Sequence, residues 1–200
     1  MAKANWVKVE PSQGSGDANV NVSSVATHTG RVARQTVLTW KAANVMDVVR
    51  TVNQAGKPEY VDIADAASSD KAGKVVTISG VSNSKKLKFS LGTGDLAITL
   101  PENYVANSVS TGNNTDIAGD PGAVSEYPFS ISIDVPANES ITAQTRQIIV
   151  EDGAGNRDVC LLTLAAGDPF ITIAEGVIEL DYVGTPVTVK VFSNTTWMIE

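Results

Sequence analysis

The sequence contains one cysteine and one histidine, and this shortage excludes several kinds of chemistry. A lone thiol, Cys160, cannot build an intrachain disulfide framework, and its apolar neighbours indicate a buried side chain. The two residues together offer too few groups for a His/Cys zinc site or for Cys–His catalysis. A Ser-His-Asp triad would need His28, which lies in a turn-like Thr-His-Thr-Gly stretch and which we expect to face solvent. With no nucleophile elbow and no glycine-rich phosphate loop either, we expect no catalytic residue, no metal and no cofactor, and a protein that is not an enzyme.

Basic residues and long apolar runs are also scarce. Lys and Arg number 15 against 22 Asp and Glu, for a net charge of -7, which argues against binding to nucleic acid through its phosphates. No segment approaches the roughly 20 apolar residues of a membrane span. The first residues lack the apolar core of a signal peptide and a cysteine for lipid attachment, so we expect no cleaved export signal.

The sequence is rich in patterns that are typical of β-strands. Short runs rich in Val, Ile and Thr alternate apolar with polar residues and are separated by Gly, Asn, Asp and Pro clusters; examples are 75–78, 87–91, 129–133 and 187–191. This pattern predicts an all-β fold of the sandwich type. Val45, Val48, Val49 and Val52 have helical spacing, but β-branching disfavours a helix, so we expect a strand there with a short helix as the alternative.

The sequence repeats itself with a period near 110 residues. Gly56-Lys57-Pro58 is echoed by Gly167-Asp168-Pro169. At the same offset of 111, Val76-Thr77-Ile78 matches Val187-Thr188-Val189, Ser82-Asn83 matches Ser193-Asn194, and Val20 and Val22 match Ile131 and Ile133. A period of this length is the size of one sandwich, which indicates repeated domains.

The phase of the repeat divides the chain into unequal parts. Residues 57–167 form one whole unit, with a long loop at about 101–126. Residues 1–56 match only the second half of that unit, and residues 168–200 match only its first half. We therefore expect one complete immunoglobulin-like sandwich flanked by two complementary half-domains in reversed order.

The two end pieces together resemble a BACON domain, an immunoglobulin-like module of Bacteroidota and their phages. The resemblance rests on 171–174, 178–180, Gly184, 187–189 and 193–197 for its first part, and on 6–16, Arg31, Arg34 and 52–56 for its second. It implies a C-terminal half of the module at 1–56 and an N-terminal half at 168–200. The middle unit is similar only to immunoglobulin-like domains in general.

This resemblance, combined with the expected lack of an export signal, points to a virion protein of a crAss-like phage. Such a protein would be an auxiliary or decoration protein on the capsid surface, assembled in the host cytoplasm, with the major capsid protein or other virion proteins as partners. The alternatives are a carbohydrate-binding module of a Bacteroidota surface protein and an excerpt of a longer tandem array. Glycan contacts would need exposed aromatic side chains, for which the candidates are Trp40, Tyr60, Tyr104 and Tyr127.

A half-sandwich leaves apolar faces and strand edges without a partner. We expect a neighbouring subunit to supply the missing half, which would give a head-to-tail homo-oligomer, either a ring or an open chain. The expected interface residues are Trp6, Val7, Val9, Trp197, Met198 and Ile199.

Polar residues crowd the 101–126 segment. Its candidate contact residues are Asn113, Asn114, Asp116 and Asp120. Their oxygen atoms could bind calcium, but they are also typical of turns and follow no EF-hand pattern. We favour a loop that contacts another protein.

Overall fold

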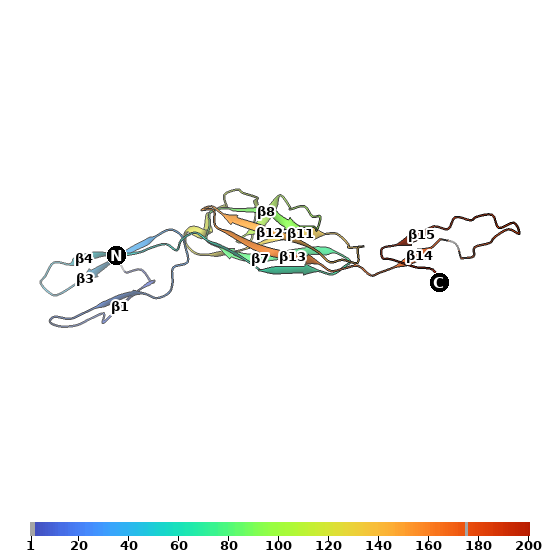
Figure 1. Ribbon diagram of the computed structural model, residues 1–200. Helices are drawn as coiled ribbons and strands as arrows, with labels where there is room; N and C mark the ends of the chain where they lie inside the picture. The colour runs from blue at the N-terminus through green and yellow to red at the C-terminus, as the bar shows by residue number, and fades with distance from the viewer. Residues whose placement is uncertain (1–2, 175) are drawn as a thin grey trace.

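The computed structural model describes residues 3–174 and 176–200, which form three β-rich parts in a row. Figure 1 shows a central sandwich with a pair of hairpins at one end and a single hairpin at the other, so that the two ends of the chain lie far apart. The only helix among the described residues is the 3₁₀ turn η1, Pro121–Ala123. No helix in this part of the chain is long and apolar enough to cross a membrane. The predicted all-β fold is confirmed.

Two sheets form the central sandwich. The first has the order β10 (Val109–Gly112), β9 (Asn103–Ala106), β11 (Tyr127–Val135), β7 (Lys74–Ser82) and β5 (Val61–Ile63). The second has the order β6 (Ala66–Ser69), β13 (Arg157–Leu164), β12 (Gln144–Asp152) and β8 (Leu87–Gly94). Neighbouring strands are antiparallel except β6 and β13, which are parallel.

The core lies between these two sheets. Residues of β11 alternate between buried and less buried positions, as expected for a strand with one face against a core. Phe89 stands at the centre, with its ring 5.1 Å from that of Tyr104 and 5.9 Å from that of Phe129. Cys160 is buried here as predicted, and this burial raises the pKa of its thiol to about 11.

The structure contradicts two of the predicted glycan-binding aromatic residues and the long loop predicted at about 101–126. Tyr104 and Tyr127 are only 2% exposed, so neither ring is available to a sugar. Residues 101–126 do not form one long loop, because β9 and β10 make a hairpin that widens the first sheet through β11. Asn107 and Ser108 connect these strands with positive φ angles of 48° and 67°, the backbone of a tight two-residue hairpin turn.

The N-terminal part consists of two hairpins. One joins β1 (Val7–Glu10) to β2 (Asn21–Ser24), and the other joins β3 (Arg34–Trp40) to β4 (Val48–Gln54). The strand expected around Val48 and Val52 is therefore confirmed, and the helical alternative is wrong. Apart from Val7 and Leu38, no apolar side chain among residues 3–56 is buried.

The C-terminal part is a single short hairpin. It joins β14 (Ile171–Ile173) to β15 (Val191–Ser193), with Ile171 opposite Ser193 and Ile173 opposite Val191. None of the described residues between 168 and 200 is buried. The C-terminal part thus has no core of its own.

Candidate assembly interface

The C-terminal hairpin repeats a strand pair of the central sandwich. In the central unit, Val61 lies opposite Ser82 and Ile63 opposite Gly80 in the β5–β7 pair. In the C-terminal part, Ile171 lies opposite Ser193 and Ile173 opposite Val191, which is the same pairing about 110 residues later. The repeated sequence therefore forms the same local structure where both of its strands are present.

The remainder of the repeated strand is unpaired. β7 runs for nine residues and pairs with β11 along its whole length, from Lys74–Val135 to Ser82–Tyr127. Its counterpart, 185–193, is a strand only at 191–193. Similarly, β11 has nine residues, whereas its counterpart 16–24 is a strand only at 21–24. Residues 16–20 and 185–190 therefore lack the strand structure that their counterparts in β11 and β7 have.

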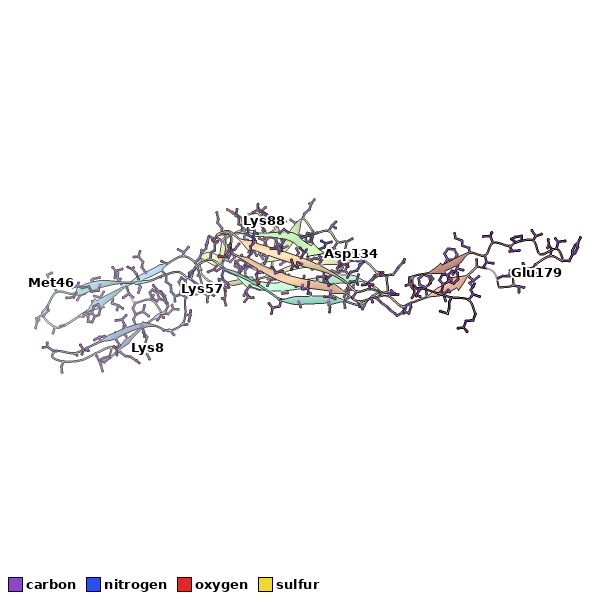
Figure 2. All side chains as sticks on the ribbon, viewed as in Figure 1. Lys8, Met46, Lys57, Lys88, Asp134 and Glu179 are labelled. Carbon is purple, nitrogen blue, oxygen red and sulfur yellow. The ribbon has the colours of Figure 1, made fainter. Side chains whose placement is uncertain are left out.

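An open cleft separates the two N-terminal hairpins. It has a volume of about 590 Å³ and runs between β1 and β3; its lining residues include Val9, Gln13, Leu38 and Trp40. Figure 2 shows these hairpins, marked by Lys8 and Met46, beyond the junction with the central sandwich at Lys57. Trp40 is 41% exposed at this cleft. In the central sandwich, by contrast, the space between the two sheets is filled by buried apolar side chains.

The predicted interface residues occupy different environments. Val7 is fully buried within its own chain, and Trp6 is half-buried with the Arg34 guanidinium 4.6 Å from its ring centre. Val9 lines the cleft. Trp197, Met198 and Ile199 are 50%, 80% and 84% exposed at the other end of the molecule. The chain therefore does not bring Trp6 and Trp197 together by itself.

The predicted contact residues of the 101–126 segment bind their own chain. Asn113 accepts a 2.8 Å hydrogen bond from the Phe89 amide and donates a 3.0 Å bond to the Phe89 carbonyl. The Asn114 amide bonds the Leu87 carbonyl at 2.9 Å. Asp116 pairs with Lys85, whose hydrogen bond lowers the pKa of the carboxyl. Among the described residues, no three His, Cys, Asp or Glu side chains gather as a metal site would require.

Asp120 contributes to the junction between the N-terminal part and the central sandwich. It pairs with Arg31, whose backbone amide donates a 2.9 Å hydrogen bond to the Gly122 carbonyl. A Cβ on Gly122 would lie 2.0 Å from the Asn83 carbonyl oxygen, so only glycine allows this close approach. Asp120 thus stabilises a contact within the chain.

Asn83 connects the two parts at this junction. Its side-chain Oδ1 accepts a 3.0 Å hydrogen bond from the Tyr60 amide. Its Nδ2 donates to the carbonyls of Thr29, Lys57 and Pro58 at 3.1 to 3.3 Å. The residue is completely buried, so these bonds satisfy a polar group that would otherwise be costly. A single side chain therefore joins the N-terminal part, the linker and the central sandwich.

Asn194 repeats this arrangement at the second junction. Its Oδ1 accepts a 2.9 Å hydrogen bond from the Phe170 amide, and its Nδ2 donates to the carbonyls of Glu139 and Asp168 at 2.8 and 2.9 Å. Asn83 and Asn194 are the repeated asparagines of the sequence, but their shared role was not predicted. The repeated Ser-Asn pair at 82–83 and 193–194 was the feature of the sequence that could have indicated this role.

The loops that these asparagines hold are also alike. His28 contacts the Val32 carbonyl at 2.7 Å, and Asn138 donates to the Thr142 carbonyl at 2.9 Å. Both side chains are buried, with 7% and 6% exposure, which corrects the expectation that His28 faces solvent. Because His and Asn differ as residues, sequence comparison gave no sign of this equivalence. The two junctions are therefore built on one plan.

Comparisons with known proteins identify no family. No family model and no curated protein matches the chain. Among solved structures, one described as the NMR structure of the protein from Bacteroides thetaiotaomicron matches with 12% sequence identity and a TM-score of 0.29, over 56% of this chain and 89% of that chain. A likeness this low establishes neither a family nor a function.

Proposed function

We propose that this chain is a structural protein that assembles head to tail. In this proposal, the C-terminal part of one copy completes the N-terminal part of the next copy to form a shared sandwich. The observation that carries the proposal is the exposure of positions whose counterparts in the central sandwich are buried. Ile131 and Ile133 are 1% and 0% exposed, whereas Val20 and Val22 are 37% and 42% exposed.

The C-terminal part gives the same contrast. Val76 is 7% exposed, but Val187 is 49% exposed; Ile63 is 1% exposed, but Ile173 is 51% exposed. Clustered apolar exposure of this kind marks an interaction surface, because each such side chain loses the stabilisation that burial provides. The two exposed sets belong to opposite halves of one repeat, so each supplies what the other lacks.

A second copy is favoured over completion within one chain. The asparagine contacts hold each terminal part at its own junction, and Figure 1 places these parts at opposite ends of the molecule. The contact is heterologous, because one surface meets a different surface of the next copy, and such contacts produce rings or open chains. An interface of this kind resembles a domain core cut in two and should bury more than about 2,000 Å².

We place this assembly on the capsid of a crAss-like phage, as an auxiliary or decoration protein that contacts the major capsid protein. The resemblance of the end pieces to a BACON domain supports this context. Immunogold labelling of purified virions with an antibody to the chain should mark the capsid surface. Labelling confined to host cells would contradict this placement without affecting the assembly proposal.

Light scattering during size-exclusion chromatography tests the assembly. The mass of the full-length protein should rise with concentration, whereas a chain lacking residues 1–55 and a chain lacking residues 168–200 should each remain monomeric. Mixed in equal amounts, the two shortened chains should form a 1:1 dimer, because each retains one half of the shared sandwich. A full-length protein that stays monomeric up to millimolar concentration would refute the proposal.

A further inference from the structure

We infer the register of the strand pairing that joins two copies: residues 16–24 of one copy pair antiparallel with residues 185–193 of the next. In this register Val20 lies opposite Val189, and Val22 lies opposite Val187. The inference rests on the proposed assembly and specifies which residues meet at its seam. Residues 185–193 of a second copy thus pair with the open edge of β2.

The template for this register is the pairing of β11 with β7. There, Ile131 lies opposite Ile78 and Ile133 opposite Val76. Moving the β11 residues back by the repeat offset gives Val20 and Val22, and moving the β7 residues forward by the same offset gives Val189 and Val187. Residues 16–20 and 185–190 both lie outside strands in the single chain, so each has a backbone edge to offer the other.

The two faces of the inferred pair agree with this register. On the side that faces the core, the register places Ala18 opposite Val191, Val20 opposite Val189 and Val22 opposite Val187. On the outer side, it places Asn19 opposite Lys190 and Asn21 opposite Thr188. A slip of one residue would turn one set of valines toward solvent, because side chains alternate between faces along a strand.

A reciprocal change in side-chain size agrees with this register. In the central sandwich Phe129 lies opposite Gly80, and a Cβ on Gly80 would be 2.3 Å from the Asp62 carbonyl oxygen and 2.4 Å from the Phe129 ring. The corresponding pair at the seam is Ala18 opposite Val191, so a small residue replaces the large one and a larger residue replaces glycine. Changes that conserve the total volume of a core are the ones that packing tolerates best.

A pair of introduced cysteines tests the register. Thr77 and Ser132 face each other on the outer side of the central sandwich, with hydroxyl oxygens 2.9 Å apart. Their counterparts at the seam are Thr188 and Asn21. We expect the double variant Asn21→Cys with Thr188→Cys to form disulfide-linked oligomers after mild oxidation, seen as a series of bands on a non-reducing gel. Reduction with dithiothreitol should leave only the band of the single chain.

Matched variants distinguish this register from its neighbours. Asn21→Cys with Lys190→Cys, and Asn19→Cys with Thr188→Cys, displace the pair by two residues on the same face and should cross-link at least tenfold less, because a disulfide requires Cα atoms within about 7 Å. Cys160 is buried and remains in all variants as a common background.

The results of these experiments show whether the inferred register or the proposed assembly is wrong. Preferential cross-linking of a displaced pair in a protein that still assembles would overturn the inferred register and leave the proposed function standing. Equal cross-linking of all three pairs would also overturn it. A wild-type protein that remains monomeric in light scattering would refute the assembly proposal and the register with it.

Discussion

Replacing Val22 with aspartate should abolish assembly while leaving the central sandwich folded. Val22 is 42% exposed in the single chain, but its counterpart Ile133 is fully buried. The burial that Val22 would gain on assembly contributes about 1 kcal/mol, since much of the side chain is already covered. Placing a carboxylate in the completed core costs several kcal/mol more, because the charge must lose its water or take up a proton. Together, a penalty of at least about 4 kcal/mol corresponds to roughly thousandfold weaker association.

Sedimentation velocity over a range of concentrations measures this change. Two control variants define the interpretation. Val75→Asp alters a valine that is 61% exposed on the central sandwich and should assemble like the wild type, whereas Ile133→Asp should unfold the central sandwich. The Val22→Asp protein should keep the main thermal unfolding transition of the wild type. Wild-type assembly by Val22→Asp would refute the reasoning, because the exposed valine would then not belong to the seam.

Two further predictions concern the junctions and the tyrosines. Asn83→Ala should destabilise the protein by about 2–4 kcal/mol in urea unfolding, because it removes the hydrogen bonds of a completely buried side chain. Asn194→Ala should leave the central urea transition unchanged, because Asn194 is only half-buried and holds a part of the chain that has no core. Similar losses from both variants would contradict the difference in their burial. Burial raises the pKa of Tyr60, Tyr104 and Tyr127, and the hydrogen bond to Glu126 adds to the effect at Tyr60. The stability that these three phenols contribute is fully present below their unfolded pKa of about 10 and is lost as the pH rises above it. Absorbance titration at 295 nm should therefore show that Tyr60, Tyr104 and Tyr127 ionise above the usual range of a tyrosine, and ionisation of these three residues near pH 10 would contradict this account.

Predictions from local sequence succeeded where the signal itself was local. Alternation of apolar and polar residues placed the strands of the central sandwich, and β-branching correctly favoured a strand around Val48. The β9–β10 hairpin was missed because its strands have only four residues each and its Asn107-Ser108 turn is a weaker signal than Asn-Gly. The role of Asp120 was also beyond local reasoning, because its partner Arg31 lies 89 residues earlier in the chain.

The sequence by itself determined the all-β character, the period of the repeat and the incomplete matches at both ends, since these follow from residue order alone. Only the tertiary structure decided which repeated segments become strands. Val-Thr-Ile at 76–78 lies within β7, whereas the similar Val-Thr-Val at 187–189 forms no strand. β7 has β11 beside it, but residues 187–189 pair with no strand among the residues that the structure describes. The structure also revealed that Asn83 and Asn194 hold both junctions in the same way, since a hydrogen bond between distant segments depends on their positions in space. A β-strand needs a neighbour to satisfy its backbone, and the residues that provide the neighbour can be anywhere in the chain or in another copy of it.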